Sequence, residues 1–365
     1  MDDSLDIDAL RTSIADVLAN ECDRETVLRH TAKQAGPLLP LWAKATELGW
    51  LALAVPESHG GLGLGIEALV PLYEELGRVA APLPMLSTML AADLLGRLAP
   101  DELQASLLPR IAEGAIATLS PPPSVCEPGL VLKRSGAEIV LSGKALDLID
   151  GRDAELILVT ARDEQQQVLW VAITADDHPH LATRQLWDHG HTLSDLLADE
   201  LRLPAGRAFA SAADAEEALL THAALGLAAE AVGGAEGILD LTIEYLKTRQ
   251  QFGKPIGSFQ ALKHRVADHR TRTVASRSLL EAATRMAARG DNRTASEASS
   301  AKVMACETYA ETARDCIQLH GGMGFTAEQA CHLYFKRAYL NCQLFGDAAL
   351  HLTRATIHLA SSEAA

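Results

Sequence analysis

The stretch YLKTRQQFGKPIG, positions 245–257, separates two long segments rich in Ala and Leu, at about 213–249 and 259–288, that have the composition of helices. Its Gly and Pro residues interrupt the helical pattern and let the backbone come close to a ligand. Arg249 can bind a phosphate through two hydrogen bonds, and the ring of Phe252 can cover an aromatic base. The stretch is therefore predicted to be a loop whose side chains suit a dinucleotide or a coenzyme A tail.

The charge of the chain changes sign around this loop. The 365 residues include 32 Lys and Arg against 48 Asp and Glu, a formal net charge of −16, which argues against nucleic acid and anionic membranes as partners. Between Glu244 and Arg277, eight basic residues accompany only two acidic ones. An anionic ligand is one explanation, and basic helix faces that pair with acidic neighbours are the other. The basic residues are Lys247, Arg249, Lys254, Lys263, Arg265, Arg270, Arg272 and Arg277.

The first part of the chain is predicted to be all-helical, over residues 1–115. Apolar residues at Leu10, Ile14 and Leu18 have the spacing of an amphipathic helix. Gly and Pro residues separate it from further helical segments. These segments lie at roughly 38–49, 66–80 and 84–98.

A β domain and a second helical domain follow. Ser120 and three consecutive Pro residues end the helical pattern, and short β-type runs predict a small β-barrel domain at residues 116–212. Those runs lie at 139–141, 156–159 and 168–173. From residue 213 to 365 we expect a four-helix bundle, so the fold class is mainly α with a β middle domain. Its helices are predicted at roughly 213–249, 259–288, 294–319 and 345–361.

The cysteines and the N-terminus predict a cytoplasmic location. None of the six cysteines forms a CxxC pair or a metal-ligand pattern, so buried, reduced thiols and no metal site are expected. The first residues, Met1 to Ser4, are acidic where a targeting peptide is basic. No apolar run approaches the ~18 residues of a membrane span.

Two more Gly-rich stretches have local explanations. GGLGLG at 60–65 resembles a dinucleotide-binding loop, but no predicted strand precedes it, and a flexible helix connection is the better interpretation. QLHGGMGF at 318–325 follows a helix, and a Gly pair there commonly ends one.

Taken together, these features resemble the acyl-CoA dehydrogenase family, flavoenzymes that oxidise acyl-CoA thioesters at the α and β carbons. The C-terminal motifs at 245–256, 259–260 and 318–325 carry most of the resemblance. An N-terminal match runs from 48–50 through 55–63 to 74–78, so the resemblance covers nearly the whole chain.

The resemblance implies a shared cofactor site. In relatives the two C-terminal motifs hold the pyrophosphate and adenine half of an FAD whose flavin is seated in the neighbouring subunit. It therefore assigns FAD contacts to Arg249, Gln251, Phe252, Gln318, Gly321 and Gly322.

The family's flavin-ring segments are altered in this chain. Where a Thr-Glu-Pro segment is expected, the chain reads TLSP at 118–121, followed by two Pro residues. Where the family has Trp-Ile-Thr, Asp147 is near the Trp position and Ile149 near the Thr position. A carboxylate supplies no aromatic cover, and Ile donates no hydrogen bond.

The family's catalytic base is a Glu at one of two places. One corresponds here to about Ala223, which has no acidic group. At the other, the loop before the last helix, Asp347 is the one carboxylate and hence the candidate catalytic base. The alternative role for Asp347 is the N-cap of the final helix.

These departures match heteromeric acyl-CoA dehydrogenases of bacterial steroid side-chain catabolism, in which two homologous chains form an α2β2 assembly with half the usual flavin sites. The resemblance implies that this chain is the one with the degenerate ring site and completes FAD sites in its partner, with acyl-CoA as substrate and electron-transfer flavoprotein as acceptor. A homomeric enzyme with Asp347 as base and a non-catalytic scaffold or regulator are the alternatives.

Overall fold

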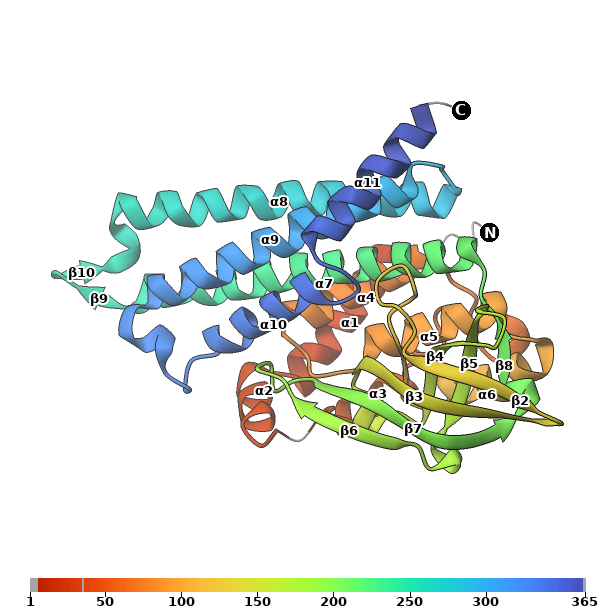
Figure 1. Cartoon of the computed structure of the whole chain (residues 1–365). Coiled ribbons are helices and arrows are strands. Elements are labelled where there is room, and N and C mark those ends of the chain that lie inside the picture. The colour runs from red at the N-terminus through yellow and green to blue at the C-terminus, as the bar shows by residue number, and fades with distance from the viewer. Residues whose placement is uncertain (1–5, 35, 364–365) are drawn as a thin grey trace. The chain divides into compact units, whose positions relative to one another are not determined.

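A computed structural model describes residues 6–34 and 36–363 of the chain (Figure 1). The described residues form two compact units. The helical unit combines the described parts of Met1–Lys33, Ile66–Ala81 and Ala224–Ala365, and the sheet unit combines those of Gln34–Gly65 and Pro82–Ala223. Both therefore contain segments that are distant in the sequence.

The helical unit is organised around one helix, α9 (Thr294–His320). Small residues such as Ala298, Ala301 and Ala305 are buried on it, which lets α8, α10 and α11 pack closely against it. Figure 1 shows α8 and α9 running side by side along much of their length. The other elements of this unit are α1 (Ile7–Glu21), α2 (Arg24–Thr31), α4 (Ile66–Arg78), most of α7 (Ala213–Thr248), β9 (Gln250–Gln251), β10 (Lys254–Pro255), α8 (Gln260–Arg289), α10 (Cys331–Gln343) and α11 (Ala348–Glu363).

Helix α10 was absent from the sequence prediction, so the region expected to hold four helices holds five. The buried positions of α10 have helical spacing, but Arg337 and Asn341 occupy two of them. Arg337 is accommodated because its guanidinium donates to the Glu230 carboxylate at 2.7 Å and to the Ala81 carbonyl at 3.2 Å. These polar residues interrupt the apolar pattern of the buried face, and for this reason the sequence pattern did not predict α10.

Helices α4 and α7 approach to backbone contact at three glycines. A Cβ on Gly233 would lie 1.8 Å from the Glu74 carbonyl oxygen, and one on Gly77 would lie 2.1 Å from the Glu230 carbonyl oxygen. Gly237 similarly faces the Arg78 carbonyl at 2.0 Å. Only glycine fits at these positions, because every other side chain would push the two helices apart.

A buried ion-pair cluster lies beside these glycines. Glu74 and Glu236 are almost inaccessible, and Arg277 of α8 bonds to both. Arg11 of α1 reaches Glu74 at 2.8 Å, and Arg78 of α4 also pairs with Glu236. Burial alone would raise the pKa of Glu236, but the hydrogen bond and charge of Arg277, with the charge of Arg78, lower it below its ordinary value. The cluster thus joins α1, α4, α7 and α8.

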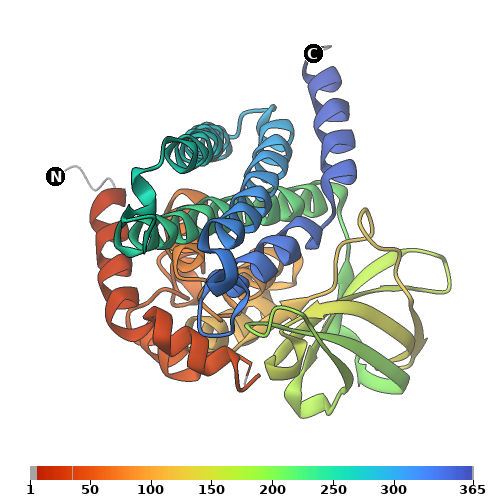
Figure 2. The ribbon, with the colours of Figure 1, turned by 90° about the vertical axis from the view of Figure 1, so that its left-hand side faces the viewer.

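The sheet unit contains an eight-stranded sheet in the order β6-β7-β3-β2-β4-β5-β8, with β1 pairing parallel to β4. Figure 2 shows strands of this sheet in yellow and green. Strands β4 and β5 are buried along nearly their whole length, as their continuous β-type runs predict, and Leu141, Ile157 and Leu196 belong to the core. The strands are β1 (Ala117–Leu119), β2 (Leu130–Ser135), β3 (Glu138–Ile149), β4 (Leu156–Arg162), β5 (Val168–Thr174), β6 (His180–Gln185), β7 (Thr192–Pro204) and β8 (Ala208–Ala210). The helices of this unit are α3 (Leu39–Glu47), α5 (Met85–Leu98), α6 (Asp101–Ala112) and the start of α7.

The expected element order of helices, β domain and helices is confirmed. The described elements change from helix to strand between α6 and β1, and back to helix between β8 and α7, while the division into three domains at 115 and 212 stays a prediction. Within residues 6–34 and 36–59 no strand precedes the glycines at 60–65, which follow a short 3-10 turn, Glu57–His59. Among the described helices only α7 is long and apolar enough to cross a membrane, and 83% of its most apolar window is buried within the protein.

The α4–α7 contact predicts a large difference between two Gly to Ala substitutions. Gly233→Ala should lower the free energy of unfolding by about 2 kcal/mol or more, since the new methyl group meets backbone. Gly96→Ala in α5, where a Cβ meets no atom within 4 Å, should be neutral or raise it by up to about 1 kcal/mol. Urea denaturation of both variants measures the difference, and equal stabilities would contradict the backbone contact.

Candidate functional site

The loop after α7 is a tight hairpin. The Arg249 N–H continues the helical bonding to the Tyr245 carbonyl at 2.9 Å, and β9 then pairs antiparallel with β10. Phe252 and Gly253 form the turn between them, both with positive φ, at 54° and 77°. Two-residue hairpins favour this geometry, and it normally selects Asn, Asp or Gly, so a Phe at the first position is unusual. The turn holds the Phe252 side chain in the open, 89% exposed.

A stacked pair of rings joins the hairpin to the second motif. Tyr245 stacks on His320 with ring centroids 4.4 Å apart, and its hydroxyl donates to the His320 carbonyl at 3.2 Å. His320 is the last residue of α9, directly before Gly321. Burial lowers the pKa of His320, so its ring stays neutral near pH 7. Two segments about seventy residues apart therefore meet at one end of the helical unit (Figure 1).

This end presents all six residues that the resemblance assigned to FAD contacts. Each of them is exposed. Within the part of the chain that the structure describes, Arg249 has no ion pair, which leaves its guanidinium open to an external anion. The exposed Phe252 ring adds a flat apolar surface, although its edge already contacts Phe259. We call this group the bundle-end surface; it comprises Arg249, Gln251, Phe252, Gln318, Gly321 and Gly322.

Most of the other basic residues between 244 and 277 are paired within the protein. Arg265 bonds to Asp315, Arg272 to Glu311 and Lys247 to Glu244. Arg270 and Arg277 belong to the pairs around Glu236. The local positive balance in the sequence therefore overstates the charge available to a ligand. Arg249, Lys254 and Lys263 remain without an ion pair among the described residues, and Lys254 lies over the Phe259 ring at 4.4 Å.

Asp347 caps α11. Its Oδ1 accepts the backbone N–H of Leu350 at 2.9 Å, the bond expected of an N-cap residue. The preceding loop is held by two buried side chains that sequence analysis did not identify, because Lys302 donates to the Gly346 carbonyl and His351 Nε2 donates to the Phe345 carbonyl at 3.1 Å. Burial lowers the pKa of His351 to about 4, with the charge of Lys302 acting in the same direction, so His351 is neutral near pH 7. The cap geometry favours the structural role of Asp347, and its role as a base stays a prediction.

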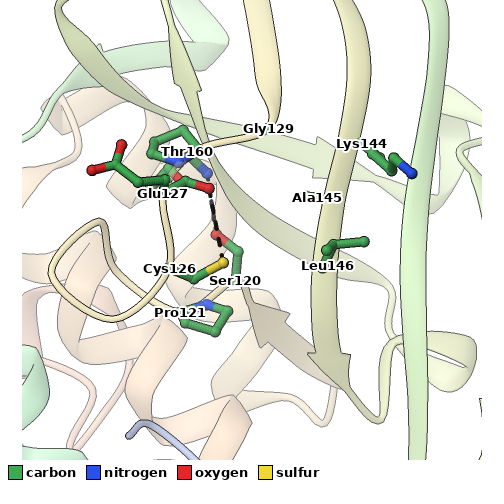
Figure 3. Close-up of a pocket in the computed structure, with 10 residues that line it drawn as sticks. Ser120, Pro121, Cys126, Glu127, Gly129, Lys144, Ala145, Leu146 and Thr160 are labelled. Carbon is green, nitrogen blue, oxygen red and sulfur yellow. Dashed lines mark hydrogen bonds between the residues drawn. The ribbon is translucent and has the colours of Figure 1, made fainter. Parts of the chain in front are cut away.

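In the sheet unit, the two segments corresponding to the family's ring contacts line one pocket of about 210 Å³ (Figure 3). Ser120 and Pro121 form one side, and Lys144 to Leu146 form the other. Ser120 accepts the backbone N–H of Thr160 at 3.2 Å, and Thr118 is buried with its hydroxyl donating to the Ile149 carbonyl at 2.6 Å. Both hydroxyl groups of this segment therefore form hydrogen bonds to the backbone of the sheet unit.

The altered positions in β3 also have internal partners. Asp147 adopts a positive φ of 62° at a break in the β3–β7 register, and its carboxylate accepts from Arg184 at 2.6 Å. Arg184 bonds to Asp195 as well, at 2.7 Å. Ile149 is 5% exposed. An ion pair and a buried aliphatic side chain therefore stand where the family places aromatic cover and a hydroxyl donor.

Comparisons with known proteins agree with this architecture. The model of the acyl-CoA dehydrogenase N-terminal domain matches residues 4–115, and that of the acyl-CoA dehydrogenase C-terminal domain matches residues 213–355. The chain is 34% identical over 336 residues to acyl-CoA dehydrogenase IpdE2 of Mycobacterium tuberculosis, covering 88% of this chain and 91% of that protein.

Two solved structures are similar over almost the whole chain. One is the ChsE4-ChsE5 complex from Mycobacterium tuberculosis, with a TM-score of 0.87, 26% identity and 97% coverage of both chains. The other is a variant of the Tcur3481-Tcur3483 steroid ACAD, with a TM-score of 0.86, 28% identity and coverage of 98% of this chain and 99% of that one.

Fold and sequence thus define the class of protein. This chain belongs to the acyl-CoA dehydrogenase family, and the resemblance inferred from its motifs is confirmed. The family is one of FAD-dependent oxidoreductases that act on acyl-CoA thioesters.

Proposed function

We propose that this chain is one subunit of a heteromeric, FAD-dependent acyl-CoA dehydrogenase, an α2β2 assembly in which its bundle-end surface binds the adenine and pyrophosphate half of an FAD seated in a homologous partner. One contrast carries the proposal. Arg249 is exposed and has no ion pair among the described residues, and the Phe252 ring is exposed, whereas Asp147 is paired with Arg184 and Ile149 is buried within the sheet unit.

The adenine half of FAD fits the residues of this chain. Arg249 supplies a charged fork for the pyrophosphate, and Gly321 and Gly322 allow close approach, since a Cβ on either would meet no atom within 4 Å. Phe252 offers a ring face for stacking. The flavin half does not fit, because the Asp147 carboxylate supplies no aromatic cover and Ile149 supplies no hydroxyl donor at the positions that correspond to the family's ring contacts.

Bound FAD supplies the hydride acceptor for α,β-desaturation of the acyl thioester. In this proposal the residues of this chain bind and orient the cofactor, and the base that removes the α proton comes from the partner. Asp347 then acts only as the cap of α11.

The substrate and partners follow from the relatives. The two similar structures are described as a ChsE4-ChsE5 complex and as a steroid ACAD, which supports a homologous second subunit and a steroid side-chain CoA ester as substrate. Electron-transfer flavoprotein is the proposed acceptor, and the cytoplasm is the proposed location.

The chain expressed alone should bind little FAD, because Asp147 and Ile149 stand where the family places the residues that hold the flavin ring. Coexpressed with the proposed homologous partner chain, it should copurify with about half as many flavins as chains, in line with the half-set of sites in the proposed assembly. Absorbance after denaturation, with amino-acid analysis, gives the ratio. One FAD for each chain in the isolated protein would contradict the heteromer.

Arg249→Ala should weaken FAD binding in the assembled complex by roughly tenfold to a hundredfold, since a charge-assisted hydrogen bond of about 1.5–3 kcal/mol is lost. Lys247→Ala is the matched control, because it removes a nearby positive charge that is already paired with Glu244 at 2.7 Å. Equilibrium dialysis gives the dissociation constant of each complex. Equal values for Arg249→Ala and wild type, with assembly intact, would make Arg249 a surface charge only.

Asp347→Asn should leave turnover within a few fold of wild type and stability nearly unchanged, because Asn caps a helix about as well as Asp. Asp347→Ala, which loses the cap, should lower the free energy of unfolding by about 1 kcal/mol. Acyl-CoA-dependent reduction of an artificial acceptor measures turnover at equal flavin content. A loss of ~100-fold or more for Asp347→Asn would identify Asp347 as the base and this chain as the catalytic one.

A further inference from the structure

The contact between α9 and α10 contains a pair of cysteines that the proposed function does not use. The Cys306 thiol donates to the Asn341 carbonyl of α10 at 3.6 Å, and the Cys342 thiol donates to the Cys306 carbonyl of α9 at 3.6 Å. Each sulfur therefore reaches across to the backbone of the other helix. The two thiols therefore lie at the same point of the α9–α10 contact.

The two thiols differ in accessibility. Cys306 is 3% exposed, while Cys342, near the C-terminal end of α10, is only half-buried. In redox-active cysteine pairs, an accessible thiol reacts first and a second, less accessible thiol then forms the disulfide with it. Cys342 and Cys306 have this arrangement.

The surroundings shift the pKa values of the two thiols in opposite directions. Proximity to the Cys306 thiol lowers the pKa of Cys342 despite its partial burial, and the nearby Lys302 charge acts in the same direction. The same contact, together with burial, raises the pKa of Cys306. The pKa is therefore lowered at the more accessible of the two sulfurs, and the thiolate is the reactive form of a cysteine.

The other described cysteines lack this combination. Cys22, Cys316 and Cys331 are fully buried, and burial raises their pKa to about 12, 12 and 11. Cys126 lines the pocket in Figure 3 and is accessible, but burial raises its pKa and no second thiol adjoins it among the described residues.

We propose that Cys342 and Cys306 form a reversible redox site that responds to small hydroperoxides. The Cys342 thiolate attacks the peroxide O–O bond and becomes a sulfenic acid, while the leaving alkoxide or hydroxide takes up a proton to give an alcohol or water. The Cys306 sulfur then attacks the Cys342 sulfur, the S–OH bond breaks, and water leaves as the disulfide forms. Two thiols are oxidised for each peroxide reduced.

The disulfide would fix the end of α10 to α9. Leu344 to Asp347 follow directly, and Lys302, one turn before Cys306 on α9, already holds the Gly346 carbonyl of this loop. Oxidation therefore stiffens the connection between α10 and α11. This inference is independent of the proposed heteromer and of FAD binding, because it requires only residues of the helical unit.

The test uses the full-length chain, reduced, desalted and treated with increasing hydrogen peroxide. Peptide mapping without reductant should show a Cys306–Cys342 disulfide, with the loss of two free thiols and their full return on addition of dithiothreitol. Because the pKa of Cys342 is lowered and that of Cys126 is raised, this loss should be faster than oxidation of Cys126. The oxidised protein should also melt at a higher temperature than the reduced protein.

Single variants separate the two roles. Cys306→Ser should leave a sulfenic acid at Cys342 that dimedone traps, Cys342→Ser should abolish the disulfide, and Cys126→Ser should change neither. Oxidation of Cys126 ahead of the pair, or oxidation of Cys342 without a disulfide in wild type, would overturn the proposal. The wild-type peptide map decides this even where a serine variant fails to fold.

Discussion

The close approach of α4 and α7 is the constraint on which the helical unit depends. Three glycines bring the two backbones into contact, and the same approach leaves Glu74 and Glu236 buried beside it. Two buried carboxylates would be strongly unfavourable alone, because desolvation penalises their charged form. Arginines from α1, α4 and α8 neutralise them, so these helices are fixed relative to α7 by both packing and charge.

The position of α7 also determines the position of the bundle-end surface. The hairpin with Arg249 and Phe252 begins where α7 ends, and Tyr245 on its last turn stacks on His320 at the end of α9. The surface is therefore built on two helix ends held by one aromatic contact. Its polar groups are open, in contrast to the paired residues at the flavin-ring positions of the sheet unit. That asymmetry is the physical basis for proposing that this chain completes a cofactor site whose remainder lies in a partner.

The loop between α10 and α11 shows how one short segment can combine several roles. Lys302 and His351 donate hydrogen bonds to backbone carbonyls of this loop, and Asp347 caps α11. Lys302 is also near the Cys306–Cys342 pair, so the charge that supports the loop also favours a thiolate. Oxidation of the thiols would therefore take place within one helical turn of Lys302, which binds the loop.

The sequence alone determined the order of helices, sheet and helices, because apolar periodicities of 3.6 and 2 residues follow from local backbone geometry. It also determined the family, through motifs whose residues are adjacent in the chain. It could not reveal α10, because the Arg337 in its buried face is satisfied by Glu230 from another helix. Only the tertiary structure showed that most of the basic residues near the hairpin are paired, that Tyr245 and His320 join the two motifs, and that Cys306 lies against Cys342. Apart from Glu244, which pairs with Lys247 one turn away, these partners are distant in the sequence, and their proximity arises from packing rather than from local spacing.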